Sequence, residues 1–174
     1  MECPGGKDLT MMMRLVLSLL ALGCVSCGGG CQSNVPRDYT AMSARFFLEA
    51  ANTDGLPLTL PQSGVRVSVN AQPVITEGDI INVELVQVDL GKCLLVQLTP
   101  SATRDFYRLS VTHQGRRLVL MVNGKTLGAR RLDGPITNGV VYLFVEMPEA
   151  ELPAFVENLK KSSVAMQREL ARKG

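Results

Sequence analysis

Three closely spaced cysteines are the side chains most able to do chemistry. Cys24, Cys27 and Cys31 form a C-x-x-C-x-x-x-C pattern, and thiolates at such spacings can bind zinc or an iron–sulfur cluster. No histidine or further cysteine lies nearby to complete a ligand shell, and the pattern directly follows an apolar segment. We therefore expect no metal and no other cofactor, and interpret these cysteines through that segment.

The apolar segment is typical of an export signal. Arg14 is followed by an apolar run from Leu15 to Leu22 and then by Gly23-Cys24. The run is about half the ~20 residues that a membrane-spanning helix needs. Ala21-Leu22-Gly23-Cys24 resembles a bacterial lipobox, in which the cysteine after a small residue is lipidated, although a lipobox usually has Leu where Ala21 stands.

The lipobox resemblance implies a membrane-anchored lipoprotein carrying fatty acyl chains such as palmitate. Cys24 is the predicted acceptor, with Cys27 as the alternative. We expect residues 1–24 to be a signal peptide, with a possible true start at Met11–Met13, and residues 25–43 to be a flexible Gly-, Ser-, Asn- and Pro-rich tether.

The remaining ionisable residues do not assemble a catalytic pattern. His113 is the only histidine, and the carboxylates Glu149 and Glu151 precede a predicted helix, where its dipole favours them. A hydrolase needs a nucleophile with a base, paired carboxylates or a metal. We expect no enzymatic activity, and an envelope hydrolase remains the least favoured alternative. The formal net charge of +2 argues against a nucleic-acid binder.

The chain after the tether predicts one α+β domain over residues 44–174. Strands are predicted around 44–51, 65–70 and 74–75, a hairpin over 81–98 that turns at Leu90-Gly91-Lys92, another hairpin over 116–132, and a strand over 140–147. Residues 55–64 are interpreted as a connection. Thr99 and Pro100 are typical of a helix start, Gly115 of its end, and Leu152, Phe155, Val156 and Leu159 form the apolar face of a final helix. We expect a mainly antiparallel sheet with two helices packed on one face.

One stretch, Leu120–Gly139, combines turn residues with arginines. Asn123-Gly124, followed by Lys125, predicts a tight hairpin turn, and Gly134, Pro135 and Gly139 mark a loop. Counting outward from the turn places Arg117 opposite Arg130. The pairs Arg116-Arg117 and Arg130-Arg131 could thus contact an acidic partner or anionic lipid; the alternative is solvated charges on alternate faces.

The region from Val65 to Leu159 resembles the first periplasmic head region of SecD, a subunit of the bacterial protein-export machinery. The similarity rests on the order of Leu98-Thr99, Phe106, Leu109-Ser110, Gly115, Arg117-Leu118, Val122–Lys125, Ala129, Pro135-Ile136 and Gly139, and on "QPVITEGDI". Asn123 stands where the family has Asp, and Arg130-Arg131 where it has an apolar residue and Pro.

The resemblance implies a non-enzymatic periplasmic or extracytoplasmic module that binds unfolded or translocating polypeptide or another envelope protein. Such a module could accept an extended chain at a sheet edge, for which Val65–Val69 and Lys125–Leu132 are the candidates. The alternative is a structural lipoprotein with only a partner interface, which an exposed apolar patch on the final helix would favour.

Overall fold

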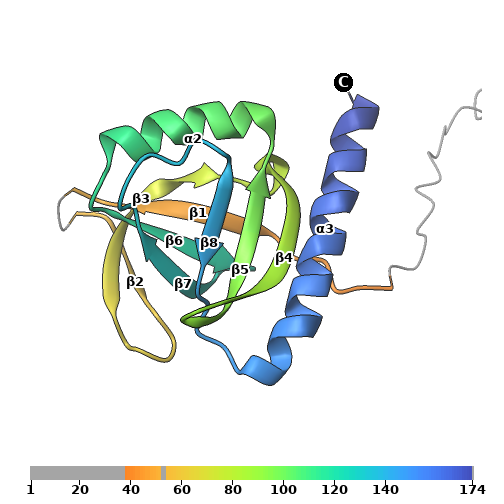
Figure 1. Ribbon diagram of the computed structural model, residues 1–174, viewed down its shortest axis with the longest axis horizontal. Coiled ribbons are helices and arrows are strands. Elements are labelled where there is room, and N and C mark those ends of the chain that lie inside the picture. Colours follow the sequence, from red (N-terminus) through yellow and green to blue (C-terminus); the bar gives the residue numbers. More distant parts are fainter. Residues whose placement is uncertain (1–37, 52–53, 174) are drawn as a thin grey trace, which may run out of the picture. The chain divides into compact units, whose positions relative to one another are not determined.

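The computed structural model describes residues 38–51 and 54–173, and residues 37–174 form one compact unit. Figure 1 shows its elements. The strands are β1 (Ala44–Glu49), β2 (Leu56–Thr59), β3 (Arg66–Ile75), β4 (Ile80–Val88), β5 (Gly91–Leu98), β6 (Arg117–Val122), β7 (Lys125–Arg131) and β8 (Val140–Leu143). The helices are α2 (Pro100–Thr112) and α3 (Leu152–Lys173), with short 3-10 turns at Glu77–Asp79 and Glu149–Glu151.

All strand pairs are antiparallel, which confirms the predicted α+β class with mainly antiparallel strands and two helices. The strands are divided between two sheets. One sheet has the order β2-β3-β1-β6-β7, and the other has the order β4-β5-β8. In Figure 1, α2 crosses the ends of the strands, and α3 runs beside β4.

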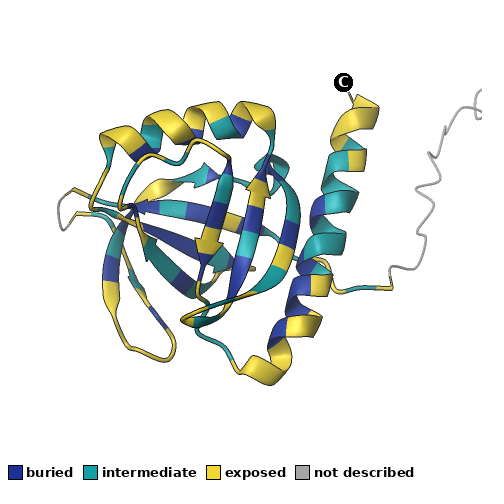
Figure 2. Ribbon diagram, in the orientation of Figure 1, coloured by how far each residue is buried: buried dark blue, intermediate teal, exposed yellow. Residues whose placement is uncertain are grey.

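The main core contains the inward-facing side chains of both sheets and one face of each helix. Phe46 of β1, Leu120 of β6 and Leu94 of β5 are fully buried in this cluster, which also contains Phe106 of α2 and Leu159 of α3. Figure 2 shows the buried residues of both helices on the sides that face the strands. Because every residue of this core lies in the compact unit, the unit has a complete core of its own.

The five-stranded sheet also has apolar residues on its opposite face. Val67, Val69 and Val119 are buried there, with Phe47 and Ala129 packed against them. The loop between β2 and β3 is tied to the segment after β8, because Glu146 accepts hydrogen bonds from the backbone N–H groups of Gln62 and Ser63 at 2.8 and 2.9 Å. Two apolar faces explain why consecutive residues are hydrophobic in Phe46–Leu48 of β1 and in Leu118–Val122 of β6.

The predicted helix starts are confirmed, whereas the predicted connection over residues 55–64 is partly a strand. Thr99 caps α2 by accepting from the Ala102 N–H at 3.2 Å, Pro100 is its first residue, and Pro153 lies in the first turn of α3. The prediction of a connection over 55–64 is wrong for Leu56–Thr59, which pairs with β3 as an edge strand. An edge position tolerates Pro57 because an edge strand leaves half of its N–H groups unpaired.

Two predicted strands have different bounds. Val74 and Ile75 end the single ten-residue strand β3, so they are not a separate strand. β8 ends at Leu143, before the predicted end at residue 147, because the chain then leaves β5 and approaches β7, where the Glu146 N–H donates to the Leu127 carbonyl at 2.6 Å.

Candidate functional site

The Asn123-Gly124 turn is a corner of the sheet. Asn123 and Gly124 have φ values of 49° and 79°, the left-handed pair that a two-residue type I′ hairpin requires. The Asn123 Oδ1 accepts from the Ser43 N–H at 2.8 Å, and the Asn123 N–H donates to the Ser43 carbonyl at 3.0 Å. An aspartate could accept the same bond from Ser43, so this contact is compatible with either residue at position 123. Lys125 begins β7 and is exposed.

The loop that contains Gly134, Pro135 and Gly139 supports α2. The Ile136 N–H donates to the Oγ of Ser110 at 2.9 Å, and Ser110 is fully buried in α2. Gly139 has a φ of 66°, and a Cβ there would overlap Thr103 of the same helix. Through these contacts the loop packs closely against α2.

The two arginine pairs lie across the β6–β7 hairpin from each other, but in a different register from the predicted one. Arg117 lies opposite Arg131, and Arg130 lies opposite Leu118. The prediction that Arg117 faces Arg130 is wrong because Leu127 is an extra residue in β7, between the pairs Leu120–Gly128 and Met121–Thr126. Such a bulge shifts every later pair by one residue.

The four arginines consequently point to different partners. Arg117 lies 3.7 Å from a carboxylate oxygen of Glu49, and Arg131 lies 3.8 Å from one of Asp133. The guanidinium of Arg130 donates to the Tyr142 carbonyl of β8 at 3.0 Å. Arg116 pairs through its backbone with Leu132. Arg130 is thus a link between the two sheets, and only the other three share the region around the start of β6.

The predicted lipid acceptors Cys24 and Cys27 lie outside the described residues, as do the signal peptide and most of the predicted tether. The last tether residues lie against α3: the Thr40 N–H donates to Asn158 at 3.1 Å, and the Met42 N–H donates to Ser162 at 2.9 Å. No helix in the described ranges is both long enough and apolar enough to span a membrane.

Groups with redox, metal or acid–base chemistry are scattered. Among residues 38–51 and 54–173, no cluster of three His, Cys, Asp or Glu could hold a metal ion. Cys93 is a buried free thiol, and its burial raises its pKa although the charge of Arg130 opposes this. His113 follows the last residue of α2, with its Nδ1 3.1 Å from the Leu109 carbonyl.

The predicted sheet edges are largely occupied. β3 is not an edge, because β2 pairs with residues 66–69. β7 is the edge of its sheet, as predicted, but the chain after β8 approaches it closely. The Leu127 carbonyl accepts from Glu146, and the Phe144 carbonyl lies where a Cβ on Gly128 would be. An added strand would have to displace this segment.

The outer face of the three-stranded sheet presents an apolar surface that we call the aromatic strip, formed by Tyr142, Phe144 and Leu95. Tyr142 lies in β8, Phe144 directly follows the end of this strand, and each is 42% exposed. Leu95 of β5 lies opposite Tyr142 and is half-buried. Successive residues of a strand face opposite sides, so Tyr142 faces away from the core that contains Val141 and Leu143. Phe144 lies beyond the strand, and its exposure places it on the surface beside Tyr142 in the chain. The sequence showed these aromatic residues, but only the structure shows that they are exposed.

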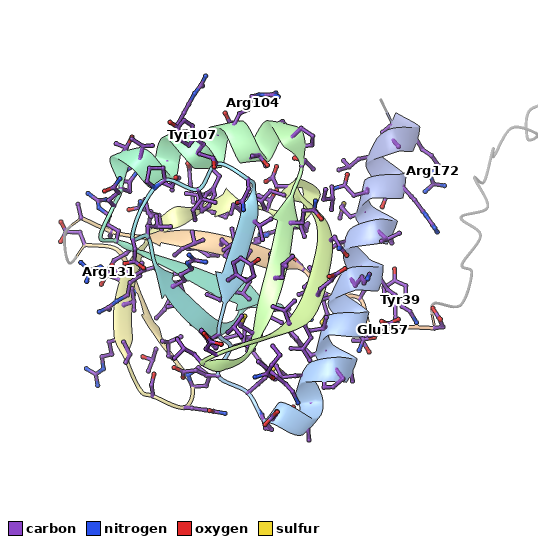
Figure 3. All side chains as sticks on the ribbon, viewed as in Figure 1. Tyr39, Arg104, Tyr107, Arg131, Glu157 and Arg172 are labelled. Atoms are coloured by element: carbon purple, nitrogen blue, oxygen red, sulfur yellow. The ribbon has the colours of Figure 1, made fainter. Side chains whose placement is uncertain are left out.

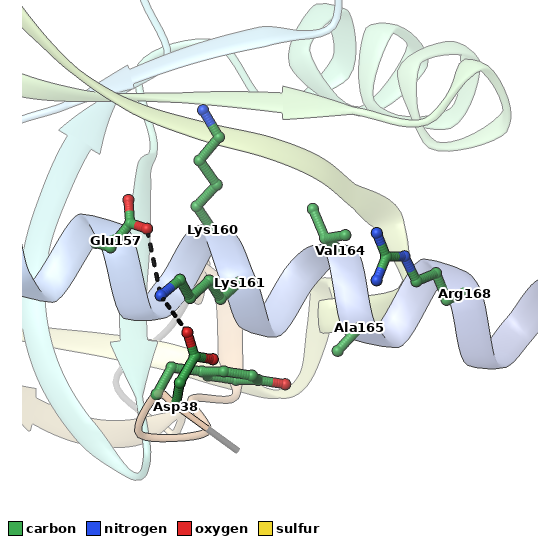
Figure 4. Close-up of a pocket in the computed structure, with 8 residues that line it drawn as sticks. Asp38, Glu157, Lys160, Lys161, Val164, Ala165 and Arg168 are labelled. Carbon is green, nitrogen blue, oxygen red and sulfur yellow. Dashed lines mark hydrogen bonds and ion pairs between the residues drawn. The ribbon is translucent and has the colours of Figure 1, made fainter. Parts of the chain in front are cut away.

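A second candidate is an open groove of about 510 Å³ along α3, shown in Figure 4. Its lining comes from residues 38–39 and from one side of the helix, including Lys160, Val164 and Arg168. Lys161 lies 3.1 Å from Asp38 and 3.6 Å from Glu157, so its charge is already compensated. The hydrogen bond from Lys161 lowers the pKa of Asp38. The groove has mixed charge and a small apolar floor.

Comparison with known proteins identifies structures with a similar fold. No protein-family model matches the chain, and no curated protein matches it. A SecDF structure in a super-membrane-facing form is similar with a TM-score of 0.51 and 14% identity, over 72% of this chain and 18% of that one. A structure described as a membrane component SecDF that enhances protein export is similar with a TM-score of 0.56 and 14% identity. The match covers 94% of this chain and 73% of that one.

SecDF from Thermus thermophilus, described as a translocon-associated membrane protein, gives a TM-score of 0.50 and 15% identity, over 72% of this chain and 20% of that one. The chain therefore spans about a fifth of the length of two of these SecDF chains. Identities of 14–15% concern the fold alone. The resemblance predicted from the sequence is confirmed at this level: the domain has a SecD-head-like fold.

Proposed function

We propose that this protein is a non-enzymatic lipoprotein of the cell envelope whose domain binds extended apolar segments of other polypeptides. The observation that carries the proposal is the pair Tyr142, near the end of β8, and Phe144, just after it, two large aromatic side chains that are each 42% exposed. Paired exposed aromatics of this kind are more typical of a binding surface than single scattered apolar residues are.

The polypeptide would lie across the aromatic strip. Addition as a further strand at β7 is disfavoured, because Glu146 and Phe144 already occupy that edge. Contacts to Tyr142, Phe144 and Leu95 would be mainly apolar, and burying each aromatic ring further contributes about 1–2 kcal/mol. Such binding is weak and tolerates many sequences, which suits transient contact with an unfolded chain.

The cellular placement rests on the N-terminus. The charged residue, apolar run and Gly23-Cys24 support export and lipidation at Cys24, or alternatively at Cys27, so that the domain would face the periplasm or the outside. One similar protein is described as enhancing protein export, which supports a polypeptide as the partner. Mass spectrometry of the mature N-terminus tests the anchor: an unlipidated Cys24 and Cys27 would refute it.

The alternative function, a structural lipoprotein with only a partner interface, is favoured by the groove on α3. That groove would hold the partner, although Leu170 is the only large apolar residue of α3 with high exposure in the described part of the chain. The aromatic strip offers a larger exposed apolar contact, so we favour polypeptide binding.

The test is titration of the domain with an unfolded, apolar peptide, followed by amide chemical shifts. We expect the largest shifts in residues 140–145 and in Leu95, and their loss in the double variant Tyr142→Ser/Phe144→Ser. Leu90→Ser is the matched control, because Leu90 is 85% exposed at the tip of the β4–β5 hairpin and lies outside the strip. Shifts confined to α3 would favour the groove as the contact surface, and an absence of shifts would refute polypeptide binding.

A further inference from the structure

Basic side chains are concentrated in one stretch of the described chain. Between Pro100 and Arg131, which spans α2, β6 and β7, Asp105 is the single acidic residue. The same stretch contains Arg104, Arg108, Arg116, Arg117, Lys125, Arg130 and Arg131. In the rest of the described chain acidic residues outnumber basic ones. Positive charge is therefore unevenly distributed along the chain, although the net charge of the whole chain is only +2.

The outward face of α2 combines this charge with apolar side chains. Arg104, Tyr107, Arg108 and Val111 follow the i, i+3, i+4, i+7 spacing of one helix face. We call this set the α2 stripe. Tyr107 is 43% exposed and Val111 is 44% exposed, and Figure 3 shows Arg104 projecting from α2 away from the strands.

Among the described residues, the two arginines of the α2 stripe have no carboxylate partner. Neither Arg104 nor Arg108 lies within 4.0 Å of an acidic group among the described residues, whereas Arg45, Arg117 and Lys92 are paired with Glu77, Glu49 and Glu149. A stripe whose cations are neither paired within the protein nor needed by the core is available for an external anion.

We propose that the α2 stripe binds the surface of an anionic phospholipid membrane. Arginines contribute about 1 kcal/mol each beside an anionic leaflet. Tyrosine suits the interface between lipid and water because its ring is apolar and its hydroxyl is polar. The stripe lies on the outward side of a helix and offers neither a groove nor a sheet edge to a peptide, whereas the broad surface of a membrane can contact it.

Membrane binding by two arginines and two modest apolar side chains is weak. It would become significant for a domain already held near a bilayer, because a tether raises the effective concentration of the surface that it faces. The proposal thus rests on the proposed lipid anchor for its effect in the cell. The α2 stripe and the aromatic strip are different surfaces, so it does not depend on polypeptide binding.

Tryptophan fluorescence gives a test with a positional readout, because the chain contains no tryptophan. The domain from Arg37 to Gly174, which has its own core, is prepared as Tyr107→Trp and separately as Tyr142→Trp. Each is mixed with vesicles of phosphatidylcholine alone or of phosphatidylcholine with phosphatidylglycerol. We expect a blue shift for Tyr107→Trp with the anionic vesicles only, and no shift for Tyr142→Trp.

Charge variants complete the test. Arg104→Gln/Arg108→Gln in the Tyr107→Trp background should lower partitioning at least about tenfold. The control Arg168→Gln/Arg172→Gln removes two arginines from α3 and should leave partitioning unchanged. Melting curves monitored by circular dichroism show that each variant is folded. The proposal is overturned by the absence of a shift for Tyr107→Trp, by an equal shift with neutral vesicles, or by unchanged partitioning of the α2 variant.

Discussion

Arg117 of β6 lies directly opposite Arg131 of β7, and neither of them lies opposite Arg130. Cross-strand neighbours have Cβ atoms about 4.5–5.5 Å apart, at which two like charges are destabilising. Both side chains are substantially exposed, and Glu49 and Asp133 lie nearby, so the repulsion is small. Arg130 points to the other side of the strand and donates to the Tyr142 carbonyl.

Adjacent arginines should therefore respond oppositely to substitution. Arg131→Thr removes the repulsion with Arg117 and should raise the free energy of unfolding by a few tenths of a kcal/mol. Arg130→Thr removes the hydrogen bond to Tyr142 and should lower it by about 0.5–1.5 kcal/mol. Urea unfolding measures both values. The reversed pair of signs would mean that Arg117 faces Arg130 and that the bulge at Leu127 is absent.

Gly128 should tolerate no side chain. The Phe144 carbonyl lies where its Cβ would be, and the adjacent Leu127 carbonyl accepts from Glu146, so an added methyl group would separate β7 from the segment after β8. We expect Gly128→Ala to lower the free energy of unfolding by more than about 2 kcal/mol. Gly134→Ala is the control, since nothing lies within 4 Å of its Cβ position. Equal thermal stability of the two variants would contradict this account.

The buried hydroxyl of Ser110 should be needed to hold the loop 133–139 against α2. It donates to the Tyr107 carbonyl at 2.8 Å and accepts from the Ile136 N–H at 2.9 Å. Ser110→Ala leaves the Ile136 N–H without this partner, and should cost about 1–3 kcal/mol. Hydrogen exchange at Ile136 should accelerate in this variant. Thr112→Ala removes an exposed hydroxyl that bonds only within α2, and should leave that exchange unchanged.

Local signals in the sequence predicted much of the fold. Thr99-Pro100 predicted the start of α2, Asn123-Gly124 predicted the β6–β7 turn, and the apolar spacing around Phe155 predicted the buried face of α3. These features depend on the conformational preferences of a few neighbouring residues. The order of such signals was also enough to indicate the SecD-head-like fold.

The surfaces could not be predicted in the same way. The bulge at Leu127 has no local signature, and it changes which arginine faces which. The exposure of Tyr142 and Phe144 depends on the pairing of β8 with β5 and on the absence of a helix over that face in the described chain. Leu56–Thr59 became a strand because of its pairing with β3, which lies ten residues further along the chain. Each of these depends on how strands pair, which overrides the local preference of a single segment.

Glu146 should make the closure of the β2–β3 loop depend on pH. Its partial burial alone would raise its pKa, but hydrogen bonds from the Ser63 hydroxyl, the Ser63 N–H and the Gln62 N–H together outweigh this effect and lower it. A pKa that is lower in the folded protein contributes stability above the unfolded value of about 4.3, and this contribution is lost as the pH falls through the folded pKa.

Glu146→Gln should therefore be less stable than the unsubstituted protein at pH 7, by less than about 1 kcal/mol because the site is partly exposed. The difference in melting temperature should shrink as the pH is lowered from 5 to 3. Asp89→Asn is the control, because Asp89 is exposed in the β4–β5 turn and its carboxylate forms no ion pair or hydrogen bond among the described residues, so its difference should be near zero throughout. A difference for Glu146→Gln that stays constant down to pH 3 would show that the carboxylate charge does not hold the loop.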